Sequence, residues 1–201
     1  GEGAANSAFV PVFSEYLVKK EYENYQKLVN ALFKTILLVL SGITVLGILF
    51  SPFIVSVIAP GFKIDFHKYQ TTVNLTRIVF PYIFFTALTA FFMGLLHTHR
   101  IFFPSALSPS MLNISLIIGA FYWTKYLGVY SLAWAVILGG VLQILIHLPS
   151  LKKVGFKPNL NVALKHPGVN KIGKLLLPRV IGSCIYQMNL FVDTILASLS
   201  K

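Results

Sequence analysis

Long apolar runs separated by short polar segments dominate the chain. Residues 35–59, 71–96, 104–123, 130–148 and 174–200 are each close to the roughly 20 residues that a membrane-spanning helix needs. Pro–Gly pairs, charged turns or a basic stretch separate these runs, and such residues end helices. The pattern therefore predicts an all-α, polytopic membrane protein.

The first part of the chain departs from this pattern. Residues 3–17 form a shorter apolar run with Pro11 inside, which we interpret as a kinked sixth helix, because proline bends a helix. Residues 15–34 are polar and basic and predict a short loop followed by the start of the next helix. The chain opens within a helical pattern and without methionine, so we expect an internal piece of a longer protein.

Composition agrees with a membrane protein and changes how the charge is interpreted. Hydrophobic residues make up 56% of the chain, charged residues 11%, and the mean hydropathy is +0.75. A net charge of +11 in a soluble chain would suggest a nucleic-acid partner. Here basic loops and anionic lipid headgroups account for it, so we expect membrane lipids and no nucleic acid as partners.

Lysine and arginine are unequally shared between alternate loops. One set of loops holds Lys19, Lys20, Lys27, Arg100, Lys152, Lys153, Lys157, Lys165 and Lys171. The other set holds Lys63, Lys68 and Lys125. The positive-inside rule predicts that the first set is cytoplasmic.

Polar side chains inside the apolar runs are the candidate functional residues. The last run carries Arg179, Asn189 and Asp193, and an ionised group in hydrocarbon costs at least about 2.5–3.5 kcal/mol unless it faces a bundle interior or a wet cavity. Asn189 and Asp193 are four residues apart and share one helix face. This helix therefore predicts a cavity wall, where a proton, a basic partner or Na⁺ would compensate Asp193.

Two further ionisable residues allow two interpretations each. Arg77, one turn before Pro81, either reaches the membrane interface or contacts an anion at the outer mouth of a cavity. Glu2 is flanked by glycines that permit close helix approach, and it is either hydrated or paired with an arginine of another helix. Asn113 and Gln143 predict hydrogen bonds between helices.

Motifs of catalysis are lacking in the sequence. It contains no G-x-S-x-G, no Walker loop and no Cys or His array at zinc spacing. We interpret His97 and His99 as residues of a solvated turn, and Cys184 as a buried, inert thiol. We therefore expect neither an enzyme nor a cofactor.

A set of short motifs resembles, in the same order, the MurJ (MviN) family of lipid II flippases. The motifs are GEGA at 1–4, AFVPVF at 8–13, APGF at 59–62, FPYI at 80–83, LSP at 107–109, LNIS at 112–115, LAWA at 132–135, GGVLQ at 139–143, LP at 148–149, LKK at 151–153 and DTILAS at 193–198. Each is short, but together they extend over essentially all 201 residues.

The resemblance implies an exporter of the multidrug/oligosaccharidyl-lipid/polysaccharide superfamily, with two six-helix lobes around a central cavity. It assigns residues 1–150 to helices two to six of the first lobe, 151–173 to a basic cytoplasmic connecting segment, and 174–201 to the first helix of the second lobe. The substrate that it implies is lipid II, the undecaprenyl-diphosphate-linked peptidoglycan precursor, moved across the bacterial cytoplasmic membrane by alternating access.

The resemblance also assigns roles to the polar residues. It implies that Glu2 lies at the substrate cavity and orients arginines on helices outside these 201 residues. We add Arg77 and Arg179 as cationic candidates, because guanidinium groups suit phosphate. Asp193 and Asn189 are candidates for coupling transport to Na⁺ or H⁺, with Asp193 as a Na⁺ ligand.

Three other functions stay open from the residues alone. The first is an exporter of drugs or polysaccharide lipids from the same superfamily, which a carboxylate-rich cavity would favour. The second is a membrane scaffold that transports nothing, whose polar residues only join helices. The third is an enzyme of polyprenyl phosphates, against which the lack of an acidic or histidine cluster argues.

Overall fold

The computed structural model describes the backbone of residues 2–178, 181–182, 192 and 194, and within these the side chains from residue 8 onward. Every regular element in this part of the chain is a helix, which confirms the predicted all-α class. The elements are α1 (Glu2–Val18), α2 (Tyr22–Leu49), α3 (Ser51–Ile58), η1 (Pro60–Ile64), α4 (Phe66–Val79), α5 (Tyr82–Thr98), α6 (Phe103–Ile118), η2 (Gly119–Trp123), α7 (Thr124–Leu127) and α8 (Tyr130–Lys153). Residues 167–178 form one more helix.

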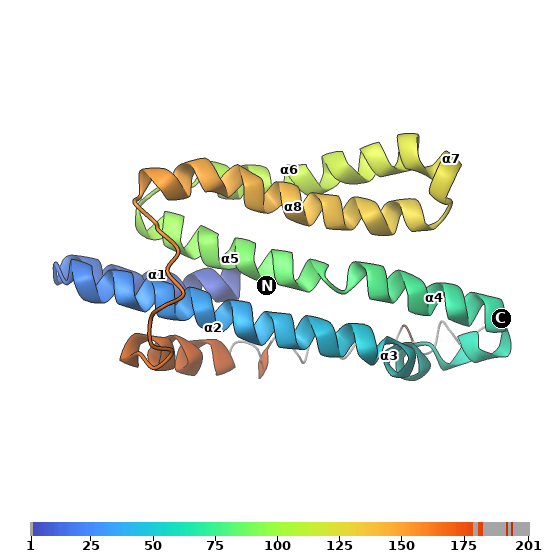
Figure 1. The fold of residues 1–201 in the computed structure, drawn as a ribbon, viewed down its shortest axis with the longest axis horizontal. Helices are drawn as coiled ribbons and strands as arrows, with labels where there is room; N and C mark the ends of the chain where they lie inside the picture. Colours follow the sequence, from blue (N-terminus) through green and yellow to red (C-terminus); the bar gives the residue numbers. More distant parts are fainter. Residues whose placement is uncertain (1, 179–180, 183–191, 193, 195–201) are drawn as a thin grey trace.

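Within the described part of the chain, four helical stretches are long and apolar enough to cross a membrane. They are Tyr22–Leu49, Phe66–Thr98, Phe103–Leu127 and Tyr130–Lys153, and α1 adds the shorter apolar helix Ala8–Val18. These stretches lie along one common direction, with α6 and α8 in one layer, α4 and α5 in the middle, and α1 and α2 on the other side (Figure 1). The arrangement is that of a polytopic membrane protein.

The two sets of loops lie at opposite ends of this bundle. The α1–α2 turn, the α5–α6 turn with Arg100 and the segment after α8 lie at the left end in Figure 1, and α7 and the α3–α4 connection lie at the right end. Tyr122 and Tyr126, near α7, are exposed there as residues of an interfacial aromatic belt would be. The cytoplasmic placement of the basic end stays a prediction.

The second helix begins earlier than the apolar run at 35–59, after the short loop that the sequence predicts. Only residues 19–21 separate α1 from α2, and Lys20 turns the chain with a φ of +58°. The first turns of α2 are amphipathic rather than uniformly apolar: Tyr25, Leu28 and Leu32 are buried on one face. On the exposed face, Lys27 pairs with Glu23 at 2.5 Å.

Two other helix boundaries also differ from the predictions. Helix α8 continues through Pro149 to Lys153, where Leu151 is buried in the core. The expected turn at 125–128 is reduced to residues 128–129, where Gly128 has a φ of +53°, because residues 124–127 are still helical. Proline near a helix end breaks few backbone bonds, so buried packing beyond it sustains the last turn.

Aromatic and aliphatic side chains fill the core between α1, α2 and α5. Phe13, Leu28, Phe91 and Leu95 are fully buried there. The rings of Phe13 and Phe91 meet edge to face, with centroids 6.3 Å apart and planes at 83°. This core joins α1 and α2 to the central helix of the bundle.

Helix α8 packs closely on two neighbours through consecutive glycines. A Cβ atom at Gly139 would lie 2.6 Å from Ser115 Oγ of α6, and one at Gly140 would lie 2.8 Å from the Cβ of Phe85 of α5. Ser115 Oγ lies 2.8 Å from the carbonyl oxygen of Ala135, so a hydrogen bond joins α6 to α8 at this contact. Small residues of this kind allow membrane helices to approach closely.

Candidate functional site

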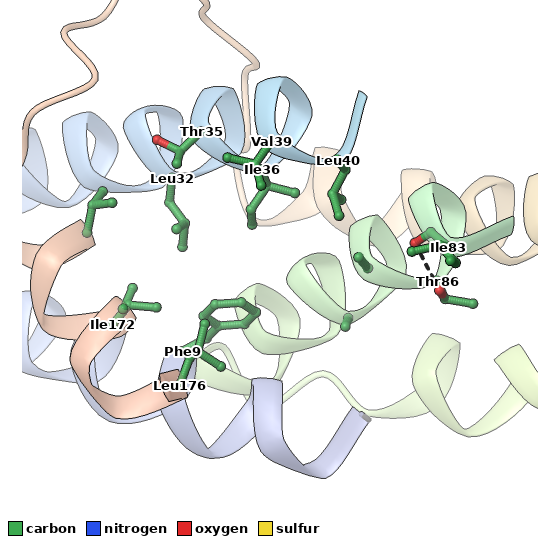
Figure 2. A pocket seen from close by; sticks show the side chains of 14 residues that line it. Phe9, Leu32, Thr35, Ile36, Val39, Leu40, Ile83, Thr86, Ile172 and Leu176 are labelled. Atoms are coloured by element: carbon green, nitrogen blue, oxygen red, sulfur yellow. Dashed lines mark hydrogen bonds between the residues drawn. The ribbon is translucent and has the colours of Figure 1, made fainter. Parts of the chain in front are cut away.

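A cavity of about 780 Å³ lies between α1, α2, α5 and the helix at 167–178. Figure 2 shows Leu32 and Ile36 of α2 facing Phe9 of α1 and Ile172 and Leu176 of the last helix across this space. The wall is almost entirely aliphatic or aromatic, because each helix presents its apolar face here. The cavity therefore suits an apolar occupant.

The two hydroxyl groups on the cavity wall are already bonded within their own helices. Thr35 donates to the carbonyl oxygen of Ala31 at 2.8 Å, and Thr86 donates to that of Ile83 at 3.0 Å (Figure 2). No charged residue lines the cavity among the described residues. A diphosphate would thus find neither a cation nor an unused donor on this wall.

Arg77 lies away from this cavity, at the end of α4. Its Nε donates to Ser51 Oγ at 3.0 Å, and the fully buried Ser51 donates in turn to the carbonyl oxygen of Ile48 at 2.9 Å. No carboxylate forms an ion pair with Arg77 within the described part of the chain. The side chain is exposed, anchored at Nε and able to donate further at its terminal nitrogens.

The anchor of Arg77 lies where two helices are interrupted. Helix α2 gives way to α3 at Phe50, and α4 gives way to α5 at Phe80 and Pro81. A Cβ at Gly47 would lie 1.8 Å from the Phe80 ring, so the two interruptions lie against each other. This contact fixes the position of the guanidinium group relative to both helix pairs.

The other predicted site residues cannot be located. Arg179, Asn189 and Asp193 lie outside the described residues, as does Cys184. Glu2 is the first residue of α1, and its side chain is likewise outside what the structure describes. Of the predicted site residues, only Arg77 has a described side chain, and it does not line the apolar cavity.

The comparison with known proteins decides the family. The profile described as "Lipid II flippase MurJ" matches residues 1–201. The chain belongs to the MurJ family. The "Lipid II flippase MurJ" of Burkholderia cenocepacia is 36% identical over 203 residues, which is 98% of this chain and 39% of that protein.

Other relatives give the same picture of the MurJ family. The "Probable lipid II flippase MurJ" of Buchnera aphidicola from Schizaphis graminum is 36% identical over 200 residues, covering 98% of this chain and 39% of the relative. That of Haemophilus influenzae is 32% identical over 206 residues, with 98% and 40% covered. The chain thus spans about two fifths of the length of these curated relatives.

Residues 154–166, the non-helical part of the predicted connecting segment 151–173, pack on the bundle, and no pattern in the sequence indicated these contacts. Asn30 Oδ1 of α2 accepts from the backbone N–H of Asn159 at 2.8 Å, and Lys34 Nζ donates to the carbonyl oxygen of Val162 at 3.1 Å. In the helix that follows these residues, Lys171 pairs with Glu15 of α1. Glu15 also pairs with Lys19 at 3.0 Å and raises the pKa of that lysine.

The histidines near the basic end are less hydrated than predicted. His97 and His99 are half-buried, and His99 Nε2 lies 2.9 Å from the hydroxyl group of Tyr25. Burial lowers the pKa of His99. The earlier interpretation as a solvated turn is wrong, because α2 covers this turn.

Acid should weaken the fold through His99. Since its pKa is lower in the folded state than the ordinary value near 6.5, the unfolded chain binds protons more readily between these two values. Stability is therefore fully present above about pH 6.5 and declines as pH falls towards the folded-state pKa.

Thermal unfolding in detergent at pH 8 and pH 5 checks this prediction. We expect the fall in melting temperature to be smaller for His99→Gln than for the parent protein. Part of the fall in melting temperature should remain in His99→Gln, because burial also lowers the pKa of His166. An equal fall in both proteins would remove His99 as a cause.

Proposed function

We propose that this chain is part of a lipid II flippase of the bacterial cytoplasmic membrane, which moves the lipid-linked peptidoglycan precursor by alternating access. The observation that carries the proposal is the family match from residue 1 to residue 201. The packed bundle of apolar helices supports it, because a lobe that rocks against another lobe must move as one body.

Within this proposal, residues 1–150 supply helices of the first lobe, 151–173 the connecting segment and 174–201 the first helix of the second lobe. Contacts inside the first part support the division: the core between α1, α2 and α5 and the close α6–α8 contact both lie within it. The hydrogen bonds of Asn30 and Lys34 to the connecting segment would transmit movement between the parts.

The cationic residues of the proposed substrate site are Arg77 and Arg179, with Glu2 orienting arginines of other helices. Arg77 is suited to this by its anchored Nε and by terminal nitrogens that form no ion pair with the described residues and match phosphate oxygens. The apolar cavity between α1 and α2 belongs to a different part of the lobe and would contact only apolar groups.

Coupling to an ion gradient is proposed for Asp193 and Asn189. A carboxylate and an amide one turn apart offer oxygen atoms to Na⁺, and the carboxylate alone offers a site for H⁺. The sequence spacing supports this role. Drug or polysaccharide-lipid transport is not favoured by any contact in the described residues.

The test is Glu2→Gln in the full-length protein, which keeps the shape of the side chain and removes its charge. We expect loss of lipid II flipping at normal abundance in the membrane, because an uncharged amide cannot form the charge-assisted hydrogen bonds by which Glu2 is proposed to orient arginines. Flipping is measured in cells depleted of their own flippase, and abundance is measured by immunoblot.

Glu23→Gln is the matched control. Glu23 is an exposed acid of α2 that pairs only with Lys27 in the described structure, and its variant should flip lipid II normally. Normal flipping by Glu2→Gln would exclude Glu2 from the substrate site. If Glu2→Gln fails to reach the membrane, Glu2→Asp, which keeps the charge, should restore abundance and flipping.

A further inference from the structure

A cluster of buried polar side chains lies between α5, α6 and α8. It consists of Thr89 on α5, Ser105 and Ser108 on α6, and Gln143 and His147 on α8, none more than 7% exposed. In each, one polar atom has no hydrogen-bond partner in the described structure: Thr89 Oγ1, Ser105 Oγ, Ser108 Oγ, Gln143 Oε1 and His147 Nε2. Neither the apolar cavity nor the proposed substrate residues include any of these side chains.

The hydrogen bonds of His147 and Gln143 on α8 show that the cluster lacks hydrogen-bond donors. His147 Nδ1 lies 2.6 Å from the carbonyl oxygen of Gln143, which can only accept, so Nδ1 carries the proton and Nε2 presents a lone pair. Gln143 uses its Nε2 to donate to the carbonyl oxygen of Ser108 at 3.3 Å, which leaves Oε1 as an acceptor. Residues 143 and 147 are one helical turn apart, so two acceptors without donors share one face of α8.

The side chains around these acceptors explain why they stay buried. The Phe92 ring of α5 packs against the His147 ring, with centroids 6.4 Å apart. Thr89 precedes Phe92 by one turn of α5, and Ser105 precedes Ser108 by one turn of α6. Each hydroxyl group therefore shares a helix face with a residue that contacts α8. Each buried polar atom left unpaired costs about 1–3 kcal/mol, so the cluster needs a partner that both donates and accepts.

We propose that the space between α5, α6 and α8 is a hydration site, in which ordered water donates to His147 Nε2 and Gln143 Oε1 and bonds the hydroxyl groups of the cluster. Water offers two donors and two acceptors, and internal waters of proteins bind at two to four such polar groups. This inference does not depend on the proposed function.

The charges of the neighbourhood favour a neutral ligand over a cation. His97 of α5 acts electrostatically on His147, and its Nε2 is also buried and without a partner among the described residues. No group of three or more His, Cys, Asp or Glu side chains that could hold a metal occurs in the described part of the chain. A metal ion here would keep an uncompensated charge in an apolar bundle, which is costly.

Water-edited solid-state NMR of the full-length protein in liposomes tests the site. The protein carries ¹³C,¹⁵N-labelled histidine and phenylalanine, and the His147 signals are assigned through their contact with the Phe92 ring. We expect polarisation transfer from water to the His147 ring at a rate comparable to that of exposed His67, with Nε2 acting as the acceptor. Polarisation transfer from water to the Phe91 ring, which is fully buried in the apolar core, should be slower than transfer to the His147 ring by about threefold or more.

Transfer to His147 no greater than to Phe91 would overturn the proposal, and this comparison needs no variant. A second comparison uses Gln143→Leu with Ser108→Ala, which removes two partners of the water. In a folded variant we expect transfer to His147 to fall to the level of Phe91. Unchanged transfer in that variant would contradict the bridging position between α6 and α8.

Discussion

Replacing Gly139 with leucine is expected to prevent α6 and α8 from packing and to abolish recovery of folded protein. A Cβ atom there would lie 2.7 Å from Leu112 Cδ1 and 3.1 Å from the Leu112 Cα, and a backbone atom of a packed helix cannot move aside. Overpacking costs about 1–3 kcal/mol, and the Ser115–Ala135 hydrogen bond would be lost in addition. Monodispersity in size-exclusion chromatography and the melting temperature measure the effect.

Gly42→Leu is the matched control, because a Cβ at Gly42 of α2 meets nothing within 4 Å in the described structure. Both substitutions exchange the same two residues in a helix interior, so the gain in helix propensity is equal. The control protein should be recovered and melt as the parent does. A Gly139→Leu protein as stable as Gly42→Leu would show that α6 and α8 do not need this contact.

Apolar length alone located the spans, and it failed where a helix is amphipathic. Runs such as 104–123 and 130–148 correspond to helices because lipid and protein surround them on all sides. The first turns of α2 instead alternate buried residues such as Leu28 with exposed ones such as Lys27. Mean hydropathy is low there, so the apolar run indicated the start of this helix only roughly, and the helical period of the buried residues marks it more closely.

The polar interior depended on pairings that a linear pattern does not contain. Gln143 was correctly predicted to bond another helix, and its partner, the carbonyl oxygen of Ser108, is 35 residues away in the sequence. Asn113 received the same prediction, which is wrong for the described residues: its side chain is exposed and bonds no other described helix. Gln143 and Asn113 are both amides within apolar runs, and they differ in hydrogen bonding because only Gln143 faces a neighbouring helix in the described structure.

The candidate site was the least predictable feature. Sequence reasoning chose ionisable residues, since their cost in lipid is evident from the residue type. It could not identify Asn30, a neutral residue near the end of a span, because its importance comes from a segment 129 residues later in the chain. The spacing of Ser105, Ser108, Gln143 and His147 was visible, but only packing of α6 on α8 makes them one cluster.

Replacing Asn30 with alanine is expected to release the connecting segment from α2 while leaving the helices folded. Asn30 is 6% exposed and accepts from the Asn159 N–H at 2.8 Å, so alanine leaves that donor unpaired. The loss of about 1–3 kcal/mol corresponds to amide exchange of Asn159 faster by about fivefold or more. Hydrogen–deuterium exchange of peptides from residues 157–164 measures it.

Asn24→Ala separates this effect from a general loosening of α2. Asn24 lies on the same helix, and in the described structure its Nδ2 donates only to the exposed carboxylate of Glu21, at 3.1 Å. That variant should leave exchange in 157–164 unchanged, and peptides from α5 should exchange equally slowly in both variants. Equal acceleration of exchange by the two variants would assign the effect to α2 itself. Acceleration by Asn30→Ala alone identifies Asn30 as the attachment of the connecting segment. It would also show that the hydrogen bond of Lys34 to Val162 does not hold the segment by itself.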